Sequence, residues 1–229
     1  MLCWHCAGAP VNSALDRAGR GDDLVTGRPR LLTTHDLLVV VFDMCSSSDI
    51  IECLTLRGEV QRLVTFLTAV KRHLRDKAKD NRFDVYKFTG DGWILLFPAD
   101  IDGAVLLSFL KGLCEFFQRE LKRNVLRYLD AMPQVTGVAL GLERGPLLKT
   151  LMFGQREYIG RALNIACRLQ TAIKDKDKSP AYKALVSNTV YNDYFRELPG
   201  VKSIAVTRTL RNIRGGTEFK CRKLTLASK

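Results

Sequence analysis

Apolar residues recur along this chain with two different periods, and each period predicts a different kind of element. Alternating or continuous apolar runs predict a hairpin over residues 83–98 and strands over residues 37–43, 134–142, 147–152, 184–187, 203–210 and 217–226. Apolar residues spaced by three or four positions predict helices over residues 58–79, 102–126 and 161–173, and a shorter helix is expected near 188–195. The first half of the chain should therefore contain a strand, a helix, a hairpin, a helix and a strand, in that order.

The hairpin gives the strongest of these local signals. Alternating residues at 84–89 are followed by Gly90-Asp91-Gly92 and then by the apolar run 93–97. An Asp-Gly pair between two such runs is typical of a hairpin turn. On turn chemistry alone, Asp91 is interpreted as a turn residue that tolerates a positive φ.

A second acidic residue gives Asp91 another interpretation. The continuous apolar run LLVVVF (37–42) ends in Asp43. A carboxylate at the end of a buried strand is costly unless it meets a cation. Asp43 at the strand end and Asp91 in the hairpin could converge on one site, which would suit hard cations such as Mg²⁺ or Mn²⁺ that also bind phosphate oxygens. Pairs of acidic residues that hold two metal ions recur in enzymes of nucleotide phosphate chemistry.

The predicted helix over residues 161–173 carries a further pair of polar residues. Asn164 and Arg168 are four positions apart, which places both side chains on one face of the helix. The loop expected just before it, residues 154–160, contains Glu157. An exposed polar face without a role is one interpretation. The rest of this helix is mostly apolar or small, however, so it has little polar surface to spare.

Length and composition limit the classes of protein this chain can belong to. Its 229 residues, 46% of them apolar, suffice for one domain with a real core, which we expect over residues 34–229 after an N-terminal arm at 1–33. No apolar run reaches the length of about 18 residues that predicts a membrane span, and the first ten residues lack the apolar core of a signal peptide. Seven scattered cysteines suit reduced thiols in a cytoplasm. Cys3 and Cys6 form a lone CxxC, which is a weak metal signal without a second pair.

The formal net charge of +12 invites a nucleic-acid interpretation. The basic residues are spread along the chain and interleaved with acids, as in KRHLRDKAKDNR (71–82) and KDKDK (174–178). No RNP-type motif, helix-turn-helix signature or paired zinc motif accompanies them. The charge pattern therefore favours a solvated surface with a phosphate-binding site over a nucleic-acid partner.

Four segments together carry a resemblance that none of them would carry alone. They are VFDMCSSS (41–48), KFTGDGWILLF (87–97), GVALGLERGPLL (137–148) and YIGRALNIACRL (158–169). In this order they resemble the catalytic domain of the class III nucleotidyl cyclases, the adenylate and guanylate cyclase family, over about residues 36–226. The resemblance implies an α+β fold, a ferredoxin-like α/β sandwich with helices on one side of an antiparallel-type sheet. It also implies a head-to-tail homodimer whose active sites form between two protomers.

The resemblance implies that the two carboxylates are metal ligands. Asp43 and Asp91 match the family's metal-binding aspartates, with Met44 directly after the first of them. The expected cofactors are two divalent ions per site, Mn²⁺ or Mg²⁺. The residues that follow, Cys45 and Ser46, match the turn whose backbone N–H groups cradle the triphosphate.

Other matched positions are implied to contact a nucleoside triphosphate substrate. Lys87 and Glu157 match the pair that reads the base, and Asn164 matches the asparagine that positions the ribose. Arg168 matches the arginine that stabilises charge on the α-phosphate in the transition state. Arg214 stands where the family often has a basic residue for the terminal phosphates. In a head-to-tail dimer these residues would face the two aspartates of the other protomer.

The polarity of the base-reading pair leaves the base open, because the donor Lys87 and the acceptor Glu157 fit adenine, uracil, cytosine and guanine alike. The size of the pocket favours a pyrimidine over a purine, since Glu157 is one methylene longer than the Asp found at this position in adenylate cyclases and since Trp93 and Arg161 are bulky. Phe88 is assigned to the same base pocket. The nearly bare domain and its KFTGDGW hairpin resemble the bacterial pyrimidine cyclases of Pycsar anti-phage defence, whose cyclic UMP or cyclic CMP activates an effector. UTP is therefore favoured, with CTP and ATP as alternatives.

Two other classes of function are set against the enzyme. The chain departs from the family where SSS (46–48) replaces Gly-Phe-Thr and where GLERG (141–145) replaces GIHxG. A degenerate module that only binds nucleotide would usually have lost an aspartate, the asparagine or the arginine, and this chain keeps all four. A nucleic-acid-binding protein would instead show steeply salt-dependent affinity for DNA or RNA and no turnover.

Overall fold

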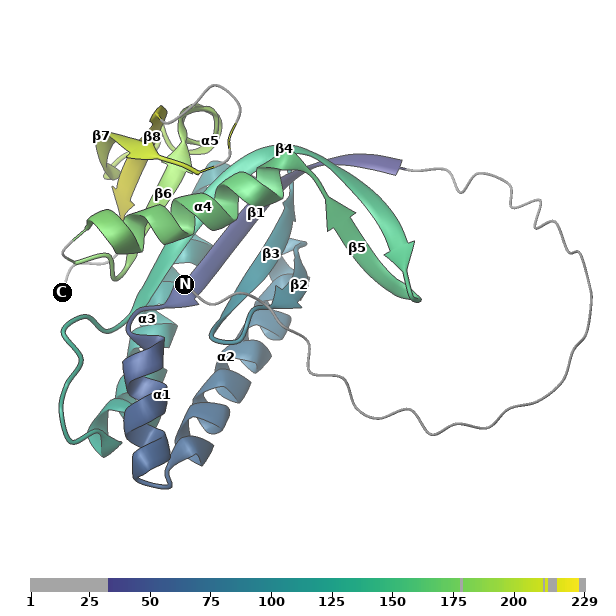
Figure 1. Cartoon of the computed structure of the whole chain (residues 1–229). Coiled ribbons are helices and arrows are strands. Elements are labelled where there is room, and N and C mark those ends of the chain that lie inside the picture. The colour runs from purple at the N-terminus through teal and green to yellow at the C-terminus, as the bar shows by residue number, and fades with distance from the viewer. Residues whose placement is uncertain (1–32, 178, 212, 214–217, 227–229) are drawn as a thin grey trace, which may run out of the picture. The chain divides into compact units, whose positions relative to one another are not determined.

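A computed structural model describes residues 33–177, 179–211, 213 and 218–226, and a single eight-stranded sheet organises them (Figure 1). The strands are β1 (Thr33–Met44), β2 (Asp84–Phe88), β3 (Gly92–Pro98), β4 (Val138–Met152), β5 (Gln155–Ile159), β6 (Lys183–Ser187), β7 (Lys202–Thr209) and β8 (Glu218–Thr225). Seven of them follow one another in the order β2-β3-β1-β4-β6-β8-β7, and β5 pairs with β4 outside this path. All neighbours are antiparallel except β4 and β6.

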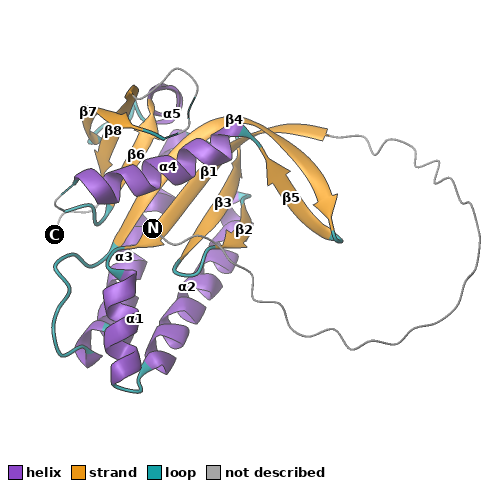
Figure 2. Ribbon diagram, viewed as in Figure 1, coloured by secondary structure: helices purple, strands orange, loops and turns teal. Residues whose placement is uncertain are grey.

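Helices cover both faces of the sheet (Figure 2), so the expectation of helices on one side only was wrong. They are α1 (Ser47–Leu56), α2 (Val60–Asn81), α3 (Gly103–Asn124), α4 (Arg161–Lys176) and α5 (Asn188–Tyr194), with a 3-10 turn η1 (Leu126–Tyr128) after α3. Helices α1, α2 and α3 lie on one face, and α4 crosses the other. The order strand, helices, hairpin, helix, strand in β1 to β4, with β1 between β3 and β4, is the ferredoxin-like arrangement that the sequence predicted.

The pleat of β1 sorts its side chains between two cores, because successive residues of a strand point to opposite faces. Val40 and Phe42 belong to the larger core, which contains the buried residues of α1, α2 and α3. Val39 and Val41 belong to a smaller core that includes alanines of α4. Asp43 continues this second set, so its carboxylate lies on the α4 face of the sheet.

The hairpin and the longer helices match the sequence prediction closely. Helices expected over 58–79, 102–126 and 161–173 are α2, α3 and α4, and the hairpin over 83–98 is β2 and β3. The first strand is longer than expected and begins at Thr33, so the arm predicted over residues 1–33 falls outside the described residues except for this one. The CxxC of Cys3 and Cys6 also lies outside them, and the boundary of the arm stays a prediction.

The prediction for strand β4 was wrong in one respect. Residues 134–142 and 147–152 were expected to be two separate strands, but β4 begins at Val138 and runs without a break to Met152. Gly145 and Pro146 pair with Leu37 and Asp36 of β1. Among the described residues no strand pairs with the other side of β4 at Pro146, so the missing N–H of proline removes no ladder bond there.

The true turn lies further on, at Phe153 and Gly154, which both have positive φ (49° and 77°) and connect Met152 to its partner Gln155. A two-residue loop of this kind matches the twist of a hairpin. Residues 154–160 were expected to be a loop, and most of them form β5 instead. The base-reading candidate Glu157 is therefore fixed on a strand.

Two further segments differ from the prediction. Helix α1 was not predicted from the sequence. The helix expected over residues 161–173 is longer than predicted, since α4 continues to Lys176. Asp177 then binds Lys223 Nζ at 2.6 Å and Lys183 Nζ at 3.2 Å, which ties the end of α4 to β8 and β6.

None of the helices that the structure describes has both the length and the apolar composition that crossing a membrane requires.

Candidate active site

The strand β1 and the hairpin bring the two predicted metal ligands to neighbouring positions. Asp43 of β1 pairs with Gly92 of β3, the residue directly after Asp91. Both aspartates are half-buried. On the α4 side, Gln170 Nε2 lies 3.4 Å from Asp43 Oδ2. The sheet register thus supports the expected convergence of the end of β1 and the hairpin.

The glycines beside Asp91 have separate tasks. Gly90 takes the positive φ of the turn (105°), so Asp91 does not need one. This removes the interpretation of Asp91 as a residue chosen for its backbone conformation. A Cβ on Gly92 would lie 2.0 Å from Phe42 O and 2.9 Å from Asp43 Oδ1. The bare backbone at Gly92 is therefore what allows β3 to approach β1 beside the Asp43 carboxylate.

The donor types present fit a hard divalent cation. Asp43 and Asp91 supply carboxylate oxygens, and backbone carbonyls and substrate phosphates are further ligands of the kind that Mg²⁺ and Mn²⁺ accept. No cluster of three or more His, Cys, Asp or Glu side chains suited to a metal occurs among the described residues. Any ion bound by the two aspartates would thus complete its shell with backbone, water or phosphate oxygens. Such partly open coordination is typical of Mg²⁺ in phosphoryl-transfer sites.

The turn after Asp43 is more enclosed than the sequence suggested. Met44 and Cys45 are buried in the larger core, and the Cys45 N–H donates to Gly137 O at 2.9 Å. Ser46 adopts the left-handed conformation (φ 54°) at the N-cap of α1 without a capping bond from its side chain. The first turn of a helix presents N–H groups with no partner inside the helix. The amides available to a phosphate here are consequently those that open α1.

The two predicted base-reading residues meet in space. Lys87 Nζ lies 3.4 Å from both carboxylate oxygens of Glu157, joining β2 to β5. Lys87 pairs with Ile94, a residue of the smaller core, so the pair lies on the same face of the sheet as α4. A hollow of about 530 Å³ opens beside it, with Met152, Phe153, Gln155, Tyr158 and Ile159 as its other lining residues.

Tyr86 is a member of this site that sequence reasoning missed. Its hydroxyl donates to Glu157 Oε2 and accepts the Tyr158 N–H at 3.1 Å. The Tyr86 hydroxyl, followed by Lys87, holds the pKa of the Glu157 carboxyl below its ordinary value. Burial and the contact with Glu157 raise the pKa of Tyr86. The sequence places Tyr86 directly before Lys87, but only the pairing of β2 with the β4–β5 hairpin reveals the contact.

Trp93 and Phe88 do not lie beside the base-reading pair. Trp93 is 2% exposed and packs in the larger core against Phe42, with ring centroids 5.6 Å apart. It points to the face of the sheet opposite Lys87. The Phe88 ring is tilted by 45° against that of Trp93, with centroids 4.8 Å apart, and is half exposed. The idea that Trp93 narrows the base pocket therefore has no support from this structure.

Asn164 and Arg168 lie one turn apart on α4, as their spacing predicts, and Asn164 is exposed. Gln170 faces the sheet and reaches Asp43, whereas Arg168, two positions earlier, turns toward the end of β7. Arg214 lies outside the described residues.

Three arginines converge where α4 meets the end of β7, and two of them were not predicted. Arg168, Arg208 and Arg211 line a hollow of about 240 Å³ together with Thr171, Ala172, Thr209 and Leu210, and none of its described lining residues is acidic. Arg168 Nη1 and Arg208 Nε are buried and have no hydrogen-bond partner among the described residues. Each of these two guanidinium groups thus has one buried N–H left to donate, and with no described acidic residue beside them the hollow is suited to an anion.

Solved structures with the same fold are nucleotide cyclases. A bacterial light-regulated adenylyl cyclase matches with a TM-score of 0.63 and 14% identity, over 86% of this chain and 54% of that chain. The guanylyl cyclase Cya2 matches with a TM-score of 0.64 and 13% identity, over 84% and 93%. The guanylate cyclase domain of RhGC from Catenaria anguillulae, in complex with GTP, matches with a TM-score of 0.61 and 14% identity, over 86% and 100%. No protein-family model and no curated protein matches the sequence.

The chain has the fold of a class III cyclase catalytic domain. This confirms the predicted fold class. The present chain spans about half the length of the light-regulated adenylyl cyclase and nearly the whole of the guanylyl cyclase chains. At these levels of identity the likeness concerns the fold, so the roles of the individual site residues rest on the geometry described above.

The segment GLERG, which departs from the cyclase pattern, contains a buried acid. Glu143 is 5% exposed and accepts hydrogen bonds from Ser187 Oγ at 2.8 Å and from the Arg144 N–H at 2.9 Å. Burial raises the pKa of this carboxyl. Through these hydrogen bonds Glu143 links β4 to the start of α5.

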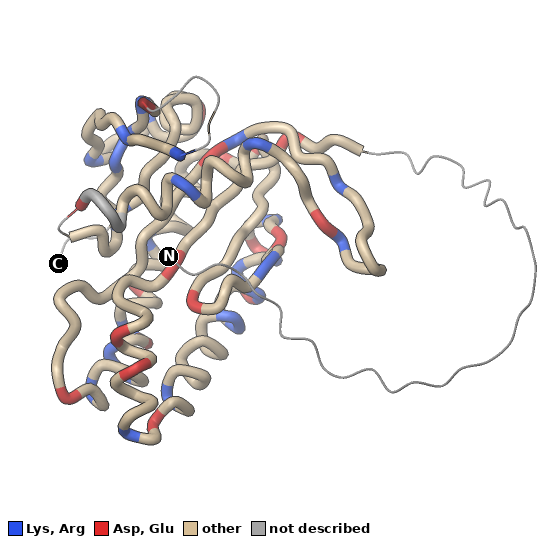
Figure 3. The backbone as a smooth tube through the Cα atoms, viewed as in Figure 1, with Lys and Arg blue, Asp and Glu red and all other residues tan. Residues whose placement is uncertain are grey.

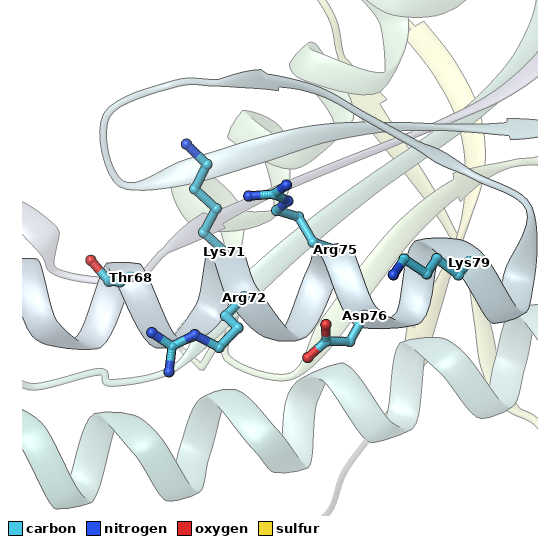
Figure 4. A pocket seen from close by; sticks show the side chains of 6 residues that line it. All are labelled: Thr68, Lys71, Arg72, Arg75, Asp76 and Lys79. Atoms are coloured by element: carbon cyan, nitrogen blue, oxygen red, sulfur yellow. The ribbon is translucent and has the colours of Figure 1, made fainter.

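A basic hollow of about 370 Å³ on α2 lies apart from these residues. It is lined by Thr68, Lys71, Arg72, Arg75, Asp76 and Lys79 (Figure 4). Lys71 and Arg75 point to one side of the helix and Arg72 to the other, so the cations diverge. Lys and Arg predominate along this helix, and Asp76 and Asp80 lie among them (Figure 3). The arrangement is that of a solvated helix surface.

Proposed function

We propose that this protein is a nucleotide cyclase that converts a nucleoside triphosphate to its 3′,5′-cyclic monophosphate and pyrophosphate. The observation that carries the proposal is the pairing of Asp43 with Gly92, which sets a strand-end carboxylate beside the hairpin that holds Asp91 in a cyclase fold. A donor–acceptor pair for a base and an arginine hollow for phosphates support it. The GTP bound to the guanylate cyclase domain with the same fold is a ligand of the class proposed here.

Each group in the proposed site has a distinct task. Lys87 donates to the base and Glu157 accepts from it, which fixes the nucleoside end. Asn164 hydrogen-bonds the ribose, and Arg168, one turn further along α4, meets the charge that develops on the α-phosphate. Two divalent ions at Asp43 and Asp91 would lower the pKa of the 3′-hydroxyl and neutralise the phosphate oxygens. Arg208 and Arg211 add positive charge where pyrophosphate leaves.

The proposed site is shared by two copies of the chain. Asp43 and Asp91 of one protomer act with Lys87, Glu157, Asn164 and Arg168 of its partner, in a head-to-tail homodimer with two equivalent sites. The hairpin of β4 and β5 extends away from the rest of the sheet, and its tip exposes Leu151, Met152 and Phe153 (Figure 1). Exposed apolar residues gathered on one projecting element mark an interaction surface. This tip supports the dimer.

UTP is the favoured substrate, and cyclic UMP the favoured product. The support is the reach of Glu157, one methylene longer than Asp, and the ring of Tyr86, which adds bulk beside its carboxylate. Both shorten the space for a base, and a displacement of about 1 Å at the reacting phosphate can cost about 10²-fold in rate. We further propose that the product is a second messenger in antiviral defence and that it binds an effector. This proposal rests on the resemblance of the KFTGDGW hairpin (87–93) to that of the bacterial pyrimidine cyclases.

The test is turnover of purified protein with Mn²⁺ or Mg²⁺ and ATP, GTP, CTP and UTP at equal concentration, with products resolved by mass. Cyclic UMP should dominate, and Asp43→Ala should lower turnover by at least about 10²-fold while the chain stays folded. Asp100→Asn, at an exposed turn, is the matched control. Cyclic CMP or cyclic AMP as the main product would contradict the proposed preference for UTP but leave the proposed cyclase activity standing. Absence of any cyclic product with all four nucleotides would overturn the enzyme.

A further inference from the structure

The hydroxyl of Tyr86 sits at the junction of β2 and β5 and binds two groups at once. It donates to Glu157 Oε2 and accepts the backbone N–H of Tyr158 at 3.1 Å. Its ring stands edge-on to Tyr158, with centroids 5.3 Å apart at 89°. These contacts hold the hydroxyl, and through it the Glu157 carboxylate, in one place relative to both strands.

The two oxygens of Glu157 are consequently not equivalent. Oε2 is bound by the Tyr86 hydroxyl, whereas among the described residues Oε1 receives only the longer contact from Lys87 Nζ at 3.4 Å. The Glu157 side chain is 22% exposed, and the hollow of about 530 Å³ opens beside it. Oε1 is therefore the oxygen left to accept a hydrogen bond from a ligand.

We propose that Tyr86 is a positioning residue for base recognition, which anchors Glu157 through Oε2 so that Oε1 accepts the N–H of the substrate base. The inference rests on the proposed function, because it concerns the base pocket of the same site. A residue that fixes an acceptor in advance lowers the ordering cost of binding. Tyr86 thereby contributes to the choice of base without touching the reacting atoms.

The electrostatics of the site agree with this role. The hydrogen bond from Tyr86, and then Lys87, keeps the pKa of Glu157 below its ordinary value, so the carboxylate is an acceptor throughout the neutral range. The titratable groups that act on Glu157 are Tyr86 and Lys87, both of β2. Its register partner on β4, Thr150, does not titrate.

The primary variant is Tyr86→Phe, which keeps the ring and removes only the hydroxyl. The KM of the preferred nucleotide should rise about 3- to 10-fold, the equivalent of one neutral hydrogen bond, with kcat changed less than KM. Discrimination between bases should fall by a similar factor. In a Glu157→Gln background, Tyr86→Phe should add no further loss of discrimination, because its effect passes through the carboxylate. Tyr128→Phe, in the 3-10 turn after α3, is the matched control.

A second readout needs no turnover. The Glu157 carboxyl, followed by NMR across pH, should titrate at a higher pH in Tyr86→Phe than in the parent protein, moving toward the ordinary value of about 4.3. Unchanged titration and unchanged discrimination in a folded variant would overturn the proposal. A parent protein that makes no cyclic nucleotide but shows the titration shift would refute the cyclase and retain the Tyr86 anchor.

If Tyr86→Phe does not fold, 3-fluorotyrosine at position 86 gives the test instead. It keeps the shape of the residue and makes the phenol a stronger donor. The proposal then expects Glu157 to titrate at a still lower pH and base discrimination to change with it. No movement of either quantity counts against Tyr86.

Discussion

Lys87 on β2 lies 3.4 Å from both carboxylate oxygens of Glu157 on β5, although 70 residues separate them in the sequence. The Lys87 side chain is 54% exposed, so this ion pair contributes little to folding. Because folding does not depend on this ion pair, Lys87 and Glu157 can give up their contact with each other and form hydrogen bonds with a base instead. Its role should appear in substrate choice rather than in the melting temperature.

The first prediction concerns this pair. Lys87→Met and Glu157→Gln should each lower kcat/KM for the preferred nucleotide about 10- to 100-fold, the range for a hydrogen bond to a charged group. The melting temperature should change little. The measurement is kcat/KM for all four nucleoside triphosphates, with the double variant completing a cycle. Unaltered base preference in folded single variants would remove the pair from the base pocket.

The second prediction tests the shared site. Asp43→Ala and Arg168→Ala should each be inactive as homodimers. When the two are mixed, both lesions can fall in the same site of a heterodimer, which leaves the other site intact. Up to about half of the parent activity per heterodimer should then return, as one of two sites is restored. Subunit exchange is first verified, for example by mass. If activity then does not return, the result counts against a head-to-tail site.

The third prediction concerns the close approach at the hairpin. Gly92→Ala would place a Cβ 2.0 Å from Phe42 O, so β1 and β3 must separate beside Asp43. Overpacking of this kind should lower the free energy of unfolding by about 1–3 kcal/mol and abolish turnover by moving the carboxylate. Denaturant melts and the cyclase assay measure the two effects.

The control for this substitution is Gly112→Ala in α3, where a Cβ meets nothing within 4 Å. It should raise the free energy of unfolding by up to about 1 kcal/mol through helix propensity and leave turnover unaltered. Equal behaviour of the two variants would show that the approach of β3 to β1 does not depend on Gly92.

The fourth prediction concerns the arginine hollow. Arg208→Gln should weaken inhibition by inorganic pyrophosphate about 10-fold, because Arg208 Nε is buried in the described structure without a partner and gains one from the anion. Arg222→Gln is the matched control, since its guanidinium lies over the Tyr191 ring at 4.6 Å instead. The measurement is the inhibition constant of pyrophosphate for each variant. Identical constants for the two would assign Arg208 a purely structural role.

Local patterns in the sequence determined a large part of this fold. The apolar run before Asp43 and the turn signal around Asp91 are short-range features, and the structure sets both where they were expected. The same holds for Asn164 and Arg168, whose spacing fixes a common helix face in any fold. Such signals work because the period of a helix or strand depends on neighbouring residues alone.

The sequence misled where two local signals competed. Gly145-Pro146 has the composition of a turn, yet it pairs with β1 inside β4, and the chain turns at Phe153-Gly154. The choice depended on which strand would lie beside β4, because only there does the missing N–H of Pro146 cost no hydrogen bond. The sequence also misplaced Trp93, because the face of the sheet to which its side chain points is set by the pairing of Trp93 with Phe42.

Contacts between distant segments were decided by the tertiary structure alone. Tyr86 meets Glu157 because the β4–β5 hairpin brings β5 beside β2, and Arg208 lines the same hollow as Arg168 because α4 crosses the sheet toward β7. Neither contact follows from periodicity, since each joins residues at least 40 positions apart. The sequence by itself determined which chemical groups were available and on which elements they would lie. The pairing of strands and the path of α4 decided which of those groups stand together, because non-local contacts are set by the packing of whole elements.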